Sequence, residues 1–172
     1  MSFVERAGLW TPERQAAAER IERLIEQHGL EVVRISFPDQ HGLLRGKTVV
    51  AGDAPKLIRS GVSITSSLLA KDTSNKTVLP IWAAGGAFGL RAFEGAGDVI
   101  MAPDPASFRV LPWAPKTGWL LADLYTTEGR PVPFATRHLL AGALQKLEAL
   151  GYDYLGCGEH VSFHGPTSNS FI

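Results

Sequence analysis

The stretch that decides the fold is VVRISFPDQHGLLRGKTVV, residues 32–50. Apolar and polar residues alternate from 31 to 37, as they do in a strand with one buried face. Residues 38–42 have the composition of a turn, and an extended pattern resumes over 43–50. Two extended runs joined by about five residues that include a glycine predict a β-hairpin.

An amphipathic helix is predicted on the N-terminal side of this hairpin. Thr11 is a suitable N-cap, and Pro12 stands at the first helical position, where a missing N–H costs nothing. Apolar residues then recur at helical spacing as far as His28, with charged residues on the opposite face. Gly29 supplies the stop, because glycine readily adopts the left-handed conformation that ends many helices.

The chain downstream of the hairpin is less uniform. A short helix is expected over 55–60, ended by Gly61. Residues 61–97 are interrupted by glycines and keep no period, so we interpret them as one long loop, of the kind that tends to be functional or interface-forming. Further along, the pattern predicts three strands, a second strong helix and a last strand, over 98–102, 108–113, 119–125, 137–150 and 152–164.

This order of elements predicts an α+β protein in which helices pack on a mixed sheet. The chain has 172 residues, 45% of them hydrophobic, which is enough to bury one core. Lys and Arg together number 17, as do Asp and Glu, so no overall charge points to nucleic acid or to a charged membrane. No internal repeat is visible.

Composition also limits the compartment. Cys157 is the only cysteine, which excludes an intramolecular disulfide and a cysteine-rich zinc site. The first residues are rich in Glu and Arg and contain no apolar signal core. No stretch approaches the roughly 20 apolar residues that a membrane span needs. We expect a cytoplasmic protein without a nucleic-acid or membrane partner.

Three segments together carry a family resemblance. Residues 39–47, DQHGLLRGK, resemble an Asp-x-x-Gly-x-x-Arg-Gly-Lys hairpin. Residues 97–104, GDVIMAPD, resemble a Ser-Asp-Met-x-Leu-x-Pro-Asp strand and turn. Residues 136–140, TRHLL, followed by LGY at 150–152, resemble a Pro-Arg-x-x-Leu helix. In this order they resemble the glutamine synthetase superfamily, closest to its glutamate–amine or γ-glutamyl-polyamine ligase branch.

The resemblance implies a β-grasp domain with flanking helices, followed by the first helix and strand of a glutamine-synthetase-type catalytic domain. The corresponding boundaries are an N-terminal amphipathic helix over 1–28, the β-grasp domain over 29–126 and the beginning of the catalytic domain over 127–172. In this family the β-grasp domain closes a neighbouring subunit's catalytic funnel. The resemblance therefore places residues 61–97 at a subunit interface.

The chemistry that the resemblance implies is ATP-dependent amide formation in nitrogen metabolism. ATP phosphorylates the γ-carboxylate of glutamate, and ammonia or an amine then displaces the phosphate. Magnesium or manganese ions neutralise the phosphate and carboxylate charge. The implied partners are further copies of the chain or full-length ligase subunits.

Two departures from the family pattern concern its ligands. Thr65 stands where ammonia-using members have an ammonium-binding aspartate, so an organic amine is the expected acceptor. The family's first metal strand reads Gly-x-Glu-x-Glu-Phe, and the two glutamate positions match His160 and Ser162 here. Serine is a poor ligand for these metals. Glu159 is left as a minor candidate, since its side chain points to the opposite strand face.

A third departure is the ending. Residues 165–171 resemble a Pro-x-x-Asn-Ser-Tyr segment that lies far downstream in full-length members. We interpret the chain as the lid and interface part of a truncated or internally deleted ligase. We expect it to be inactive alone and to have no catalytic, cofactor-binding or metal-binding residues of its own. The alternative is a non-catalytic β-grasp module that co-assembles with full-length subunits and regulates them. A free-standing β-grasp protein with an unrelated partner is a third possibility.

Several side chains have more than one interpretation. Arg45 and Lys47 share a strand face, where they contact a phosphate, a neighbour's carboxylate or solvent. His41 is expected to be a turn histidine rather than a catalytic one, and Cys157 a small buried residue rather than a nucleophile. Packing in the core or at an interface is preferred over nucleotide stacking for three tryptophans: Trp82, Trp113 and Trp119. A His160–His164 metal site is disfavoured, because residues four apart on a strand lie about 13 Å apart.

Overall fold

The computed structural model describes residues 1–84 and 89–154, and the chain divides into two compact units, 1–139 and 140–172. The helices and strands, with their bounds, are α1 Phe3–Arg6, α2 Pro12–His28, β1 Val32–Pro38, β2 Leu44–Val50, α3 Ala54–Ser60, β3 Val62–Thr65, β4 Asp98–Pro103, β5 Arg109–Val110, β6 Thr117–Thr126 and α4 Thr136–Ala149. The 3-10 helices are η1 Ala51–Asp53, η2 Ser66–Ala70, η4 Arg91–Ala96 and η5 Pro105–Ser107.

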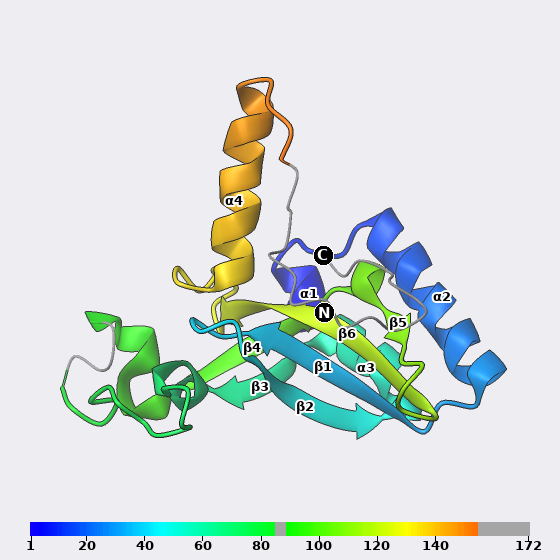
Figure 1. Cartoon of the computed structure of the whole chain (residues 1–172), viewed down its shortest axis with the longest axis horizontal. Helices are drawn as coiled ribbons and strands as arrows, with labels where there is room; N and C mark the ends of the chain where they lie inside the picture. Colours follow the sequence, from blue (N-terminus) through cyan, green and yellow to red (C-terminus); the bar gives the residue numbers. More distant parts are fainter. Residues whose placement is uncertain (85–88, 155–172) are drawn as a thin grey trace, which may run out of the picture. The chain divides into compact units, whose positions relative to one another are not determined.

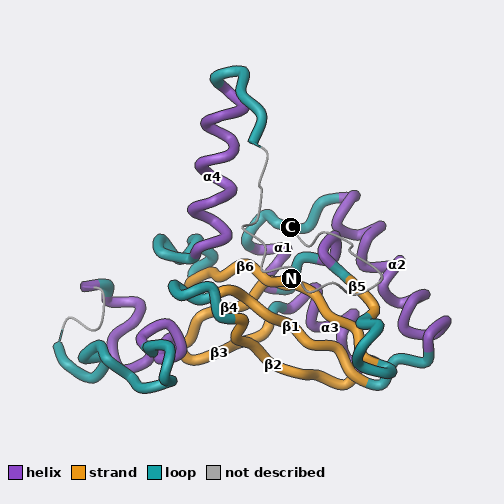
Figure 2. Tube along the Cα trace, viewed as in Figure 1, coloured by secondary structure: helices purple, strands orange, loops and turns teal. Residues whose placement is uncertain are grey.

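The first unit is built on one mixed sheet with the strand order β2-β1-β6-β4-β3, and β5 pairs with β6 beside this path. Strands β1 and β6 run parallel, and the other pairs are antiparallel. Figures 1 and 2 show the strands lying side by side as one twisted layer. The predicted hairpin is confirmed as β1 and β2, in a register that sets Phe37 opposite Arg45.

The core follows from strand alternation. In β4, Val99 and Met101 are buried in the main core, while Ile100 and Ala102 join a smaller cluster on the other face with α1. The main core also takes buried side chains from β1, β6 and the helices α2 and α3, and these side chains include Val33, Ile35, Phe37, Leu120, Leu124, Ile21 and Ile58. The sheet is therefore covered by helices on both faces, as expected for an α+β layout.

The long N-terminal helix begins and ends where the sequence predicts. The Thr11 hydroxyl accepts a hydrogen bond from the Arg14 amide, and Pro12 occupies the first turn of α2. At the other end, Gly29 has φ 55°, and its N–H reaches carbonyls of the last turn. Ile21 is 1% exposed and carries the apolar face of α2 into the core.

The two outer strands of the sheet are joined by one side chain. The Lys47 ammonium, on β2, donates a 2.7 Å hydrogen bond to the Ser63 carbonyl, on β3. These strands lie at opposite ends of the strand order, so the sheet curves until its edges approach each other. A lysine on an edge strand also satisfies a carbonyl that would otherwise be open to another chain.

Two sequence predictions about this unit are wrong. Residues 61–97 are not one loop: they contain β3, η2 and η4, and β3 pairs with β4. Only four residues alternate in β3, too few to stand out beside the glycines. The strand expected over 108–113 is reduced to Arg109 and Val110, because the chain turns between 111 and 117 and the Leu111 amide donates to the Thr117 carbonyl.

Near the end of the described residues the predicted helix is confirmed, but the first residues of the strand predicted over 152–164 are not a strand. Helix α4 is present, and Gly151 follows it with φ 79°. Residues 152–154 form no regular structure, and the rest of the strand predicted over 152–164 lies outside the described residues. Within the described residues no helix is long and apolar enough to cross a bilayer.

Candidate functional site: the hairpin and the segment it holds

The turn of the β1–β2 hairpin is organised by one buried carboxylate. Asp39 is 1% exposed, and its Oδ1 accepts hydrogen bonds from the backbone amides of His41 at 2.8 Å and Leu43 at 2.9 Å. Gly42 has φ 76°, a conformation that side-chain-bearing residues rarely adopt. Asp39 and Gly42 of the motif are therefore needed to make the turn itself.

Arg45 neutralises this carboxylate. Its Nε lies 2.6 Å from Asp39 Oδ2, and the two side chains are 13% and 0% exposed. Burial by itself raises the pKa of Asp39, but the bond from Arg45 and the bonds from the His41 and Leu43 amides together lower that pKa below its usual value. The carboxylate therefore stays charged, as a buried carboxylate must be paired to do.

The other end of the Arg45 guanidinium holds the segment that follows η2. Its Nη1 donates to Asn75 Oδ1 at 2.9 Å, and its Nη2 donates to the Asp72 carbonyl at 3.2 Å. The Gln40 amide adds a 2.7 Å bond to the Leu69 carbonyl. Three donors of the guanidinium are therefore used within the chain, by Asp39, Asn75 and Asp72.

The held segment also has internal order. Asp72 Oδ1 accepts bonds from the Ser74 amide, the Ser74 hydroxyl and the Lys76 amide, at 2.9, 2.8 and 2.9 Å. Asn75 takes a left-handed conformation, φ 66°, which asparagine tolerates better than most residues. The Lys71 ammonium donates to the Asn75 carbonyl at 3.0 Å. We call residues 66–78 the held segment.

The last two residues of the DQHGLLRGK motif join two strands. A side chain at Gly46 would place its Cβ 1.9 Å from the Ile35 carbonyl oxygen, so only glycine fits against β1. Lys47 then reaches Ser63 across the sheet edges. The motif that carries the resemblance is thus a clamp, formed by Asp39, Arg45 and Lys47.

Thr65 lies at the end of β3, where the held segment begins. Its hydroxyl lies 3.1 Å from the Ala96 carbonyl, to which it donates, and it accepts from the Ser67 amide at 3.3 Å. The Ser67 hydroxyl lies 3.0 Å away. Thr65 is exposed, so the Thr65 hydroxyl lies outside the core.

The second and third resemblance segments meet through charge. The Arg137 guanidinium lies 2.9 Å from Asp104 and 2.9 Å from Asp123, so the start of α4 is tied to β6 and to the turn after β4. These two carboxylates raise the pKa of Arg137 against the effect of burial. The Arg14 guanidinium donates to the Pro103 carbonyl nearby. Sequence spacing does not show this pairing, because 33 residues separate Asp104 from Arg137.

The remaining candidate residues divide in two. His160, Ser162, Glu159, His164 and Cys157 lie outside the described residues, so the metal and cysteine interpretations stay predictions. Among residues 1–84 and 89–154, no three His, Cys, Asp or Glu side chains converge as ligands for a metal ion.

Burial divides the three tryptophans. Trp82 is 77% exposed and Trp113 is 64% exposed, so neither packs in the core of this chain, and packing at an interface stays the prediction for both. Trp119 is half-buried, and its Nε1 donates to the Ser36 hydroxyl at 3.2 Å. His41 is an exposed turn residue whose amide bonds Asp39. Sequence reasoning missed Asn75 and Ser63, which contact the clamp; neither belongs to a motif.

Comparison with known proteins supplies the family. No family model matches the chain. A γ-glutamylanilide synthase from an Acinetobacter species is 35% identical over 167 residues, which is 95% of this chain and 33% of that protein. A glutamate–isopropylamine ligase from a Pseudomonas species is 29% identical over 77% of this chain. The chain belongs to the glutamine synthetase superfamily.

Solved structures agree with this family. A structure described as a GmaS/ADP complex superposes with a TM-score of 0.57 at 28% identity, covering 76% of this chain and 26% of that one. A glutamine synthase homologue at 20% identity has the same TM-score, which supports the fold alone. The chain spans about one third of the length of the curated relatives it matches, and a β-grasp-like domain accounts for the shared part.

Proposed function

We propose that this chain is the lid and subunit-interface part of an ATP-dependent glutamate–ammonia or glutamate–amine ligase, and that by itself it does not complete the reaction. The observation that carries the proposal is the clamp: Asp39, Arg45 and Lys47 of the DQHGLLRGK motif use their polar atoms within the chain, to shape the hairpin, to hold residues 66–78 and to join β2 to β3. In such a part the described residues build the wall of a site, and the bond-making chemistry belongs to other residues.

The division of the chain follows from the same proposal. Residues 29–126 form the β-grasp domain, preceded by the amphipathic helix over 1–28, and residues 127–172 begin the catalytic domain. The ligase acts in the cytoplasm and requires ATP with magnesium or manganese when the whole protein is assembled. The chemistry these groups supply is activation of the glutamate γ-carboxylate as an acyl phosphate, the leaving group for an amine.

The acceptor follows from Thr65. We infer an organic amine rather than ammonium, because a neutral hydroxyl attracts a small cation less strongly than the negative charge of an aspartate does. Two named relatives act on organic amines, the γ-glutamylanilide synthase and the glutamate–isopropylamine ligase. The Thr65 hydroxyl is already bonded to Ala96 and Ser67, which leaves an apolar methyl group and a neutral pair facing the acceptor.

A phosphate-release assay tests the proposal. The purified chain is incubated with ATP, magnesium, glutamate and either ammonia, isopropylamine or putrescine. We expect release no faster than in a reaction without protein. Robust turnover by the chain alone contradicts the inactivity, and its dependence on the amine then identifies the acceptor. Sequencing the coding DNA beyond Ile172 is the matching genetic test.

The second candidate function is a non-catalytic module that co-assembles with full-length subunits. It is favoured by apolar side chains that are exposed at the turn of the hairpin and in the stretch that follows η2: Leu43, Leu44, Val78 and Trp82. Co-expression with a full-length relative, followed by size-exclusion chromatography, tests it. Co-elution that Leu44→Ser and Trp82→Ser reduce, and Val50→Ser leaves unchanged, supports the module; separate elution counts against it.

A further inference from the structure

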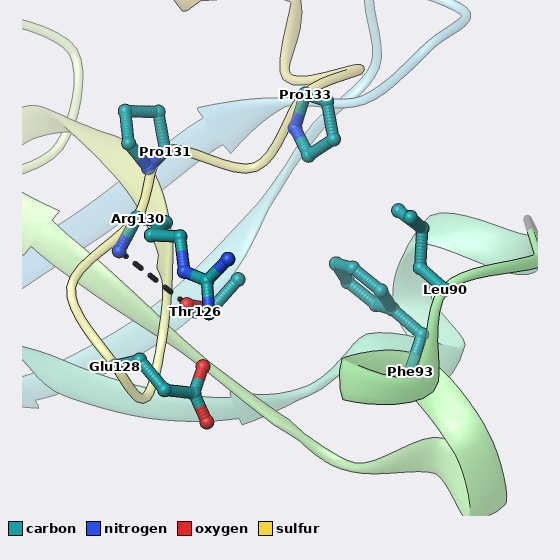
Figure 3. A pocket seen from close by; sticks show the side chains of 7 residues that line it. All are labelled: Leu90, Phe93, Thr126, Glu128, Arg130, Pro131 and Pro133. Carbon is teal, nitrogen blue, oxygen red and sulfur yellow. Dashed lines mark hydrogen bonds between the residues drawn. The ribbon is translucent and has the colours of Figure 1, made fainter.

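A pocket of about 510 Å³ lies between η4 and the turn that follows β6, away from the clamp residues. Figure 3 shows its seven lining side chains around one open space. They are Leu90, Phe93, Thr126, Glu128, Arg130, Pro131 and Pro133. Its volume falls in the range of about 300–1,000 Å³ that is usual for small-molecule sites.

The pocket has two chemically different sides. Leu90, which precedes η4, and Phe93, within η4, form the apolar side, and Pro131 lies across the space from them beside Arg130 (Figure 3). Phe93 is 1% exposed and belongs to the main core, which makes this wall rigid. Moving the apolar part of a ligand from water to this wall lowers the free energy.

The other side carries one fixed anion and one cation with donors to spare. The Thr127 hydroxyl donates to the Glu128 carboxylate at 2.9 Å. Interactions with the Thr126 side chain, above all, and with the nearby Arg130 lower the pKa of Glu128. The Arg130 amide bonds the Thr126 hydroxyl at 3.4 Å, which shapes the turn (Figure 3). Within the described residues no hydrogen bond or ion pair engages the Arg130 guanidinium.

These features select one class of ligand. A guanidinium with free donors is a planar receptor for a carboxylate. A simple carboxylic acid would also meet the negative charge of Glu128, and an amine without a carboxylate would meet Arg130, so each is repelled by one of the two groups. A ligand that carries a carboxylate and an ammonium on one carbon can pair with Arg130 and Glu128 together. Its apolar side chain then packs against the apolar wall.

We propose that this pocket binds a zwitterionic α-amino acid with an apolar side chain. The carboxylate lies on Arg130, the ammonium on Glu128, and the side chain against Leu90, Phe93 and the two prolines. This inference goes beyond the ligase function and does not rest on it, because no reacting group of the proposed amide formation is involved. It assigns the chain a binding site for a free amino acid.

The test is a ligand titration of the 172-residue chain by ¹H–¹⁵N NMR and calorimetry. The probes are L-phenylalanine, 3-phenylpropionate, which lacks the amine, and 2-phenylethylamine, which lacks the carboxylate. We expect saturable shifts in residues 89–93 and 126–133 with L-phenylalanine, and binding about tenfold weaker for each of the other two probes, since one charge-assisted bond is lost.

Variants locate the binding. Glu128→Gln and Arg130→Gln each weaken binding of L-phenylalanine about tenfold. Both residues are exposed turn residues, so these variants fold. Glu22→Gln and Arg34→Gln remove the same charges from exposed positions elsewhere and leave binding unchanged. No saturable binding, equal binding of the three probes, or pocket variants that behave like the controls each overturn the proposal. None of these outcomes bears on the phosphate-release assay.

Discussion

The main core and the held segment keep their shapes by different means. The core around β1, β4 and β6 is made of buried apolar side chains that alternate along their strands. The held segment, residues 66–78, begins inside that core, where Leu69 is buried; Gln40 bonds the Leu69 carbonyl, and residues 71–78 are held by polar bonds that include those from Arg45 on the hairpin. The core rests on many small contacts that no single residue dominates. Residues 71–78 are half-buried or exposed, and they rest on a few polar bonds, two of them from the Arg45 guanidinium.

This difference has a consequence for function. A segment held by a few polar bonds opens at a lower free energy than a core strand, because fewer contacts must be broken. In the proposed ligase Thr65, which directly precedes this segment, faces the acceptor, and local opening of the segment leaves the sheet intact.

The largest effect is expected in the core. Leu120, in the central strand β6, is 0% exposed, and Leu120→Ala should lower the free energy of unfolding by about 4 kcal/mol through lost burial and a residual cavity. Urea denaturation followed by circular dichroism measures it. Leu121→Ala, on the opposite and half-buried face of the same strand, is the matched control and should cost clearly less. Equal losses would mean that β6 does not alternate as described.

Removing the centre of the clamp comes next. Arg45→Ala leaves the buried Asp39 carboxylate without its cation, and the free energy of unfolding should fall by about 3 kcal/mol. Hydrogen exchange in residues 66–78 should rise more than exchange in β1 and β6, since Arg45 bonds Asn75 and Asp72. Arg34→Ala, exposed on the neighbouring strand, should change neither. A uniform rise over the whole chain would show that the held segment is not a separate unit.

Acid should release the same clamp more gently. The folded-state pKa of Asp39 lies below its unfolded value, so its contribution is present above the unfolded pKa of about 3.9 and is lost as the pH falls through the lower folded value. The free energy of unfolding should therefore decline below about pH 4, and Asp39→Asn should flatten that decline. The measurement is urea denaturation between neutral pH and pH 3. The same pH dependence of the free energy of unfolding in both proteins would mean that Asp39 does not cause the decline.

The smallest effect is expected at the sheet edges. Lys47→Met removes one bond, from an exposed ammonium to the Ser63 carbonyl, and should lower the free energy of unfolding by about 0.5–1 kcal/mol. Exchange of the β3 amides should increase while exchange of the β1 amides stays the same. Lys56→Met, on the exposed side of α3, is the control. Unchanged exchange in β3 would mean that the two edges are held together by other contacts.

Local patterns in the sequence predicted most of the fold. The N-cap Thr11, Pro12 and the stop at Gly29 are all local signals, and each stands where expected because a helix end depends on residues within one turn of it. The hairpin was predictable because turn composition and alternation lie within 19 residues. Strand β3 was not, because its partner β4 lies more than 30 residues away and only that pairing makes four residues a strand.

The candidate site was predicted only as a motif, without its partners. DQHGLLRGK indicated a family, but its residue types left Arg45 and Lys47 with several possible partners. Their actual partners, Asn75, Asp72 and Ser63, are 16 to 30 residues away and belong to no motif. The pocket between η4 and the β6 turn left no sequence signal, because its apolar and charged sides come from separate segments.

The sequence by itself determined the helix ends, the hairpin and the family to which the motifs belong, since each of these depends on residues that are near neighbours in the chain. Tertiary structure alone decided that the motif is a clamp, that the sheet edges meet through Lys47 and that Arg137 joins Asp104 and Asp123. A long polar side chain reaches many possible partners, and only the folded backbone selects among them.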